Sequence, residues 1–245
     1  MSLDAVKEEY ERVRGAETAN STFYDFLVRL EWRRVMPRGA HPKKASDEDI
    51  ESKKKINEML RKMNCHILPF TEPGAKIRLF FMDEAGFGRV SEPSYCWCPG
   101  GVRPIIPCHR VREYVYAFGA VEPITGDKFF IISPKCNTAW TNEFLRLLSE
   151  QYKNDYLLIP TDNAAWHKSK DLLIPDNITL FYLPPYTPEM NPIEQVWKDV
   201  RKDGFKNTLF NSLADVVDKL SVSLMSLTNV TVNSICARQW IVEMF

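Results

Sequence analysis

The sequence predicts an α/β protein built on a mixed β-sheet with helices packed against it. Two observations carry this prediction. Short apolar runs bounded by turn residues cluster in the middle of the chain, and segments of helical period alternate with further runs towards its end. The 245 residues, 44% hydrophobic and 26% charged, are enough for one sizeable domain with a buried core and a small appendage.

The first part of the chain predicts two short helices. Residues 2–15 form a charged helical stretch, and Asn20 opens a helix N-terminal signal that precedes a second amphipathic segment. Two helices joined by a glycine-containing turn and followed by basic residues suggest a helix-turn-helix, although helical hairpins are common and the signal alone is weak. From residue 46 a further helix is predicted, with acidic residues in its first turn.

From residue 76 onwards the pattern is that of a sheet. The predicted strands are 77–82, 95–97, 114–118, 128–132, 156–159 and 178–183, and the predicted helices are 138–152, 165–173, 191–202 and 213–227. Antiparallel strands followed by alternating helices and strands make a mixed sheet flanked by helices. An RNase H-like fold has this order of elements.

These patterns predict three parts in the chain. Residues 1–45 are expected to form a small all-α, partly complete helix-turn-helix segment with a basic linker, residues 46–75 a connector helix, and residues 76–245 an RNase H-like domain.

Global charge does not point to nucleic acid, because 32 basic residues balance 32 acidic ones. Locally the charge is uneven, since residues 29–44 contain Glu31 as their one acidic residue. The basic residues of this stretch are Arg29, Arg33, Arg34, Arg38, Lys43 and Lys44. Such a stretch suits contact with DNA phosphates, the alternative being a solvated surface arm.

The six cysteines are expected to be reduced in an intracellular, cytoplasmic protein. No apolar run reaches the roughly 18 residues of a membrane span, which argues against a membrane protein. Cys96 and Cys98, with Cys108 and His109 further on, invite a zinc interpretation. Their spacing differs from the common zinc patterns, so structural zinc is disfavoured.

Three acidic residues stand at the ends of patterned segments. Asp83 follows a buried run, Asp162 follows another, and Glu194 lies in the first turn of a helix. In a mixed sheet the two strands can be neighbours, which would bring both aspartates to one edge. Three hard oxygen ligands favour Mg²⁺ or Mn²⁺, and two such ions can drive phosphodiester chemistry. Taken singly, each residue could instead be a cap, a turn residue or a solvated carboxylate.

Three blocks of sequence resemble the signature motifs of DDE transposases, in particular the mariner superfamily in its bacterial insertion-sequence branch. The blocks are residues 81–87, 162–169 and 183–197, and the last is long and specific. The resemblance implies an RNase H-like catalytic domain in which Asp83, Asp162 and Glu194 are the catalytic residues and bind the metal ions, Mg²⁺ or Mn²⁺. It also implies cleavage of double-stranded DNA at the terminal inverted repeats of an element, strand transfer into target DNA, and a homodimer when active. A bacterial protein with this function is expected to be associated with the nucleoid in the cytoplasm.

Neighbouring residues have simpler interpretations. His167 and Lys168, just past Asp162, could contact a phosphate or merely lie on the surface. Asn191 is expected to cap the following helix, and Trp197, one turn beyond Glu194, is expected to belong to the core.

Two departures from the family pattern bear on function. Asp162 and Glu194 are separated by 31 residues, fewer than is usual, and the chain resembles only the end of the paired helix-turn-helix region. It therefore looks like the second part of a split reading frame or a truncated copy. Two alternatives stay open: a non-catalytic DNA-binding remnant, and an RNase H-type nuclease acting on RNA–DNA hybrids.

Overall fold

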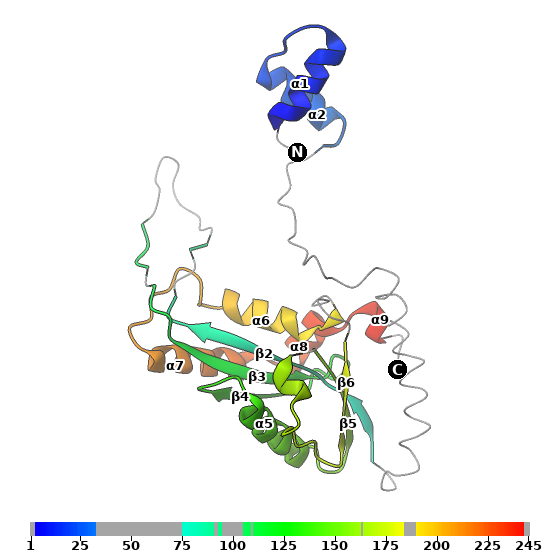
Figure 1. Cartoon of the computed structure of the whole chain (residues 1–245), viewed down its shortest axis with the longest axis vertical. Coiled ribbons are helices and arrows are strands. Elements are labelled where there is room, and N and C mark those ends of the chain that lie inside the picture. Colours follow the sequence, from blue (N-terminus) through cyan, green and yellow to red (C-terminus); the bar gives the residue numbers. More distant parts are fainter. Residues whose placement is uncertain are drawn as a thin grey trace. The chain divides into compact units, whose positions relative to one another are not determined.

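The computed structural model describes residues 3–32, 75–90, 93–94, 105–108, 110–162, 164–183 and 190–242. The chain divides into two compact units, residues 1–41 and 42–245, and each is considered by itself (Figure 1). No helix of the described part is long and apolar enough to cross a membrane. The expected strand at 95–97 and the connector helix over 46–75 fall outside the described residues.

The N-terminal unit contains helices α1 (Leu3–Arg14) and α2 (Asn20–Arg29), as the sequence predicts. They close over one aromatic cluster, in which the fully buried Phe23 and its neighbour Phe26 pack against Tyr10 with ring centroids 5.2 and 4.7 Å away. Helix α2 begins where expected, but its cap is Ala19 without a side-chain bond. The Asn20 side chain instead accepts a hydrogen bond from Lys7 Nζ at 2.8 Å, which ties the two helices together.

The second unit is built on two sheets that continue into each other. One is parallel in the order β1 (Ile77–Leu79), β5 (Tyr156–Thr161), β6 (Ile178–Tyr182), and the other antiparallel in the order β2 (Phe81–Gly88), β3 (Tyr114–Val121), β4 (Lys128–Ser133). Phe80 alone separates β1 from β2, and its N–H donates to Leu158 O at 2.9 Å. The predicted antiparallel portion with parallel additions is therefore confirmed.

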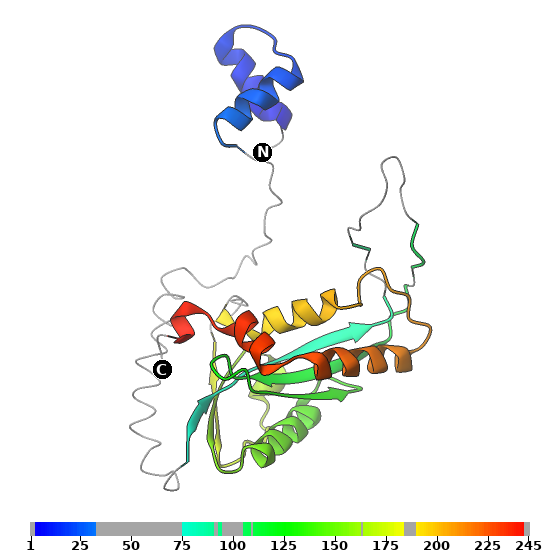
Figure 2. The ribbon, with the colours of Figure 1, turned by 180° about the vertical axis from the view of Figure 1, so that it is seen from behind.

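Helices cover both faces of the sheet. Figures 1 and 2 show α5 (Thr138–Gln151) on one side and α6 (Ile193–Lys202) with α7 (Leu213–Ser226) on the other. Alternation along β2 divides its side chains accordingly, since Met82 belongs to the cluster under α5 whereas Phe81 belongs to the cluster under α6 and α7. Asp83 follows the same alternation and faces α6.

A buried ion network ties the edge of the parallel sheet to the β3–β4 hairpin. Arg78 of β1 donates to Glu122 at 2.5 Å, to Asp127, and to Asp155 at 3.4 Å. Its side chain is largely buried, as is that of Glu122. Charges buried to this extent need partners, so the network fixes how the hairpin sits on β1.

Several boundaries differ from those expected. The strand predicted to end at Met82 continues as β2 because its pairing with β3 runs on to Gly88, so Asp83 lies inside a strand. The helix expected over 165–173 is a single 3-10 turn, η2 (Ala165–Lys168). After it, the Ser169 hydroxyl accepts a hydrogen bond from the Asp171 N–H and the Ser169 carbonyl accepts one from the Leu172 N–H, so the helix does not continue. Two short helices, α8 (Asn229–Cys236) and α9 (Gln239–Val242), follow α7, which was expected to be the last.

Candidate active site

Asp83 is held between β3 and α6. In the β2–β3 ladder it lies opposite Gly119, and its Oδ2 accepts a hydrogen bond from Trp197 Nε1 at 3.0 Å. Burial raises the pKa of Asp83 well above its ordinary value, and the nearby charges of Glu194, Glu84 and Asp162 raise it further. The site therefore concentrates negative charge around a carboxylate that is poorly hydrated.

Asp162 follows directly on β5, whose parallel pairing with β1 brings it towards the strand that carries Asp83. Its Oδ1 accepts from the Ala164 N–H and from His167 Nδ1, both at 2.9 Å, while 55% of the side chain stays exposed. Burial opposes ionisation, but the bonds from His167 and Ala164 outweigh it and lower the pKa of Asp162. This aspartate is accordingly oriented and negatively charged.

Glu194 comes from the first turn of α6, where the positive end of the helix dipole favours a carboxylate. The helix is fastened to β2 by Asn191, whose Nδ2 donates to Met82 O at 2.9 Å. The expectation that Asn191 caps α6 is therefore wrong: the cap position is Pro192, and the amide of Asn191 serves the strand next to Asp83 instead. Glu194 and Asp162 both lie close enough to Asp83 for their charges to act on its carboxyl group.

A buried pair of side chains, His167 and Glu84, completes the site; the sequence predicted a phosphate contact or a surface role for His167 and gave no role to Glu84. His167 is fully buried and places its two ring nitrogens 2.9 Å from Asp162 Oδ1 and 2.9 Å from Glu84 Oε1, with the Thr161 hydroxyl 3.0 Å away. Burial disfavours the imidazolium, but the two carboxylates prevail and raise the pKa of His167 to about 9. The one hint in the sequence is that His167 closes a turn after Asp162. Glu84, from another strand, gave no signal.

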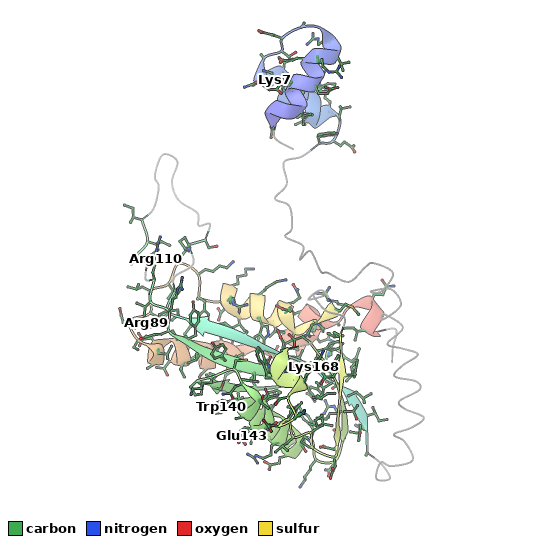
Figure 3. The ribbon with its side chains drawn as sticks, in the orientation of Figure 1. Lys7, Arg89, Arg110, Trp140, Glu143 and Lys168 are labelled. Atoms are coloured by element: carbon green, nitrogen blue, oxygen red, sulfur yellow. The ribbon has the colours of Figure 1, made fainter. Side chains whose placement is uncertain are left out.

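The residues predicted to contact phosphates lie in different surroundings in the structure. His167 cannot touch a phosphate here, because its side chain is committed to Asp162 and Glu84 and has no exposed surface. Lys168, labelled in Figure 3, is exposed, with Nζ 5.2 Å from the centroid of the Tyr182 ring. Arg29, in the last turn of α2, is exposed too. The other candidates, Arg33, Arg34, Arg38, Lys43 and Lys44, fall outside the described residues.

The remaining predictions concern a core tryptophan and a possible zinc site. Trp197 belongs to the core as expected, with 1% of its surface exposed. Of the residues considered for zinc, Cys96, Cys98 and His109 fall outside the described part of the chain. Within the described ranges, no three Asp, Glu, His or Cys side chains already form a group that could hold a metal ion.

Comparisons with known proteins agree with this geometry. The model of the DDE superfamily endonuclease family matches residues 78–217, which include all three carboxylates. The chain is 33% identical over 130 residues to the uncharacterized protein y4pE/y4sA of Sinorhizobium fredii, covering 52% of this chain and 96% of that protein.

Solved structures show the same fold. The Mos1 transposase paired-end complex with the left transposon end superposes with a TM-score of 0.67 at 13% identity, over 97% of this chain and 74% of that one. A Mos1 mariner paired-end complex with Mn gives 0.63 at 14% identity, over 99% and 75%. The predicted RNase H-like fold and the resemblance to DDE transposases are thereby confirmed, and the chain belongs to the DDE superfamily endonuclease family.

Proposed function

We propose that this chain is a transposase that cleaves double-stranded DNA at the ends of an element and transfers the ends into target DNA, using Asp83, Asp162 and Glu194 as metal ligands. The observation that supports this most directly is the unbalanced charge at Asp83. The pKa of Asp83 is raised by burial and by the carboxylates of Glu194, Glu84 and Asp162, and the imidazole of His167 is shared between Glu84 and Asp162. A divalent cation would relieve this repulsion.

The chemistry of the donor set suits Mg²⁺ or Mn²⁺, and an ion would have to draw together the three carboxylates, which among the described residues do not form a group that could hold a metal ion. Carboxylate oxygens are the ligands these ions prefer, and the three come from a strand, a strand end and a helix start. Trp197 Nε1 donates to Asp83 Oδ2, and the Ala164 N–H and His167 Nδ1 both bond to Asp162 Oδ1, so these contacts orient each carboxylate. When bound, two such ions supply activation of a water or 3′-hydroxyl and stabilisation of the leaving oxygen.

The residues of the chain perform the positioning. Helix α6 places Glu194 beside β2, and the Asn191 amide holds the start of this helix there through its hydrogen bond to Met82 O. His167 keeps Asp162 oriented through its hydrogen bond to Oδ1. Exposed Lys168, and Arg29 with the basic residues that follow it, would neutralise DNA phosphates. Bringing two element ends together suggests a homodimer in the active complex.

The decisive experiment compares the wild-type protein with Asp162→Asn on a supercoiled plasmid in Mg²⁺. The variant is expected to bind DNA as the wild type does but to leave it uncut, because a ligand for the ions is lost and the fold around it is not. Full nicking by Asp162→Asn would refute the proposed role of the triad.

Two further measurements separate the alternatives. Cleavage of an RNA–DNA hybrid in preference to duplex DNA would indicate an RNase H-type nuclease. Absence of Mg²⁺ and Mn²⁺ binding in calorimetry, with DNA binding retained, would indicate a non-catalytic remnant.

A further inference from the structure

We propose that Trp197 is a positioning residue that sets the place of Asp83 relative to Glu194 for metal binding, an inference that rests on the proposed function. Trp197 lies three residues after Glu194 on α6, so both side chains project towards the sheet from neighbouring turns of one helix. Its indole N–H donates to Asp83 Oδ2 at 3.0 Å. One rigid side chain therefore joins the helix that carries Glu194 to the carboxylate on β2.

The sheet is shaped to receive this indole. Gly119 is the residue paired with Asp83 across the β2–β3 ladder, and a Cβ placed on it would come within 2.7 Å of Trp197 Cη2 and of the Phe130 ring. The absence of a side chain at Gly119 thus lets the indole approach β3 closely while its N–H reaches Asp83 on the neighbouring strand β2.

Aromatic neighbours fix the ring in this pose. Phe130 packs against Trp197 with centroids 5.7 Å apart, and Phe87 meets it edge-on at 6.3 Å. With the ring held in this pose, its N–H donates to Asp83 Oδ2 and so fixes the orientation of that carboxylate. Groups that orient a metal ligand in this way typically contribute 10- to 100-fold to metal affinity or activity.

The test uses Trp197→Phe in the full-length chain, because phenylalanine keeps an aromatic ring over Gly119 but has no N–H. A matched control is Trp140→Phe on α5, a partly buried tryptophan that packs in the cluster on the opposite face of the sheet (Figure 3). Three quantities are measured for each protein: the melting temperature without metal, the Kd for Mn²⁺ by calorimetry, and the rate of plasmid nicking as a function of Mn²⁺ concentration.

Trp197→Phe is expected to weaken Mn²⁺ binding and slow nicking at fixed Mn²⁺ by about 10- to 100-fold, with unchanged DNA affinity. Trp140→Phe is expected to match the wild type in both its Mn²⁺ affinity and its nicking rate. If Trp197→Phe melts lower but binds Mn²⁺ with wild-type affinity, Trp197 is a packing residue and the inference is wrong.

The same measurements keep this inference distinct from the proposed function. A wild-type protein that binds Mn²⁺ without cutting DNA would refute the function, while the Mn²⁺ affinities would still decide the role of Trp197. A wild-type protein that binds no divalent ion would overturn both.

Discussion

The buried imidazole of His167 predicts a pH-dependent stability that can be measured without DNA or metal. The perturbation is His167→Gln, which keeps a hydrogen-bond donor at this position but carries no charge at any pH. In the wild-type protein Glu84 and Asp162 raise the pKa of His167 from its ordinary value of 6.5 to about 9. At about 1.4 kcal/mol per pKa unit, this shift corresponds to a stabilisation of roughly 3 kcal/mol.

The sign of the effect follows from the direction of the shift. Because the folded protein binds this proton more tightly than the unfolded chain, the stabilisation is complete below about pH 6.5 and is lost as the pH rises through about 9. The free energy of unfolding of the wild type should therefore exceed that of His167→Gln by roughly 3 kcal/mol at pH 6, and this difference should narrow steadily towards pH 10.

The assay is urea unfolding followed by circular dichroism at several pH values, with EDTA present throughout. Lys168→Gln is the matched control, since it removes a positive charge from the adjacent, exposed residue and should follow the wild type within about 0.5 kcal/mol. A gap between wild type and His167→Gln that stays constant from pH 6 to pH 10 would refute the charged pair between His167 and its two carboxylates.

Two more predictions concern buried charge. Asp83→Asn should abolish metal-dependent cleavage yet raise the melting temperature in EDTA at neutral pH. Burial and the neighbouring carboxylates raise the pKa of Asp83 in the folded protein above its ordinary value of 3.8, so this carboxyl group costs stability as the pH rises above that ordinary value, and asparagine carries no such cost. A lower melting temperature would contradict this account. Arg78→Met should lower the free energy of unfolding by about 3–5 kcal/mol, because it leaves the buried carboxylate of Glu122 without its cation. The control is Arg146→Met on the exposed face of α5, which should lower the free energy of unfolding by less than about 1 kcal/mol in the same denaturation experiment.

Much of the fold could be read from local pattern. The alternation that predicts strands over 114–118 and 128–132 and the helical period of 138–152 depend only on neighbouring residues, so these elements lie where expected. Boundaries that depend on a partner strand could not be read in this way. The extension of β2 to Gly88 is an example, since it follows from the length of β3.

Motifs and periodicity are properties of contiguous residues, so they were enough to predict the family, the order of the main elements and the three carboxylates. The way in which those carboxylates are held depends on contacts between distant parts of the chain. Glu84 meets His167 across 83 positions and Asp83 meets Trp197 across 114, through strand register and helix docking. A buried residue of this kind acts through whichever group the packing places beside it, and no local pattern encodes that neighbour.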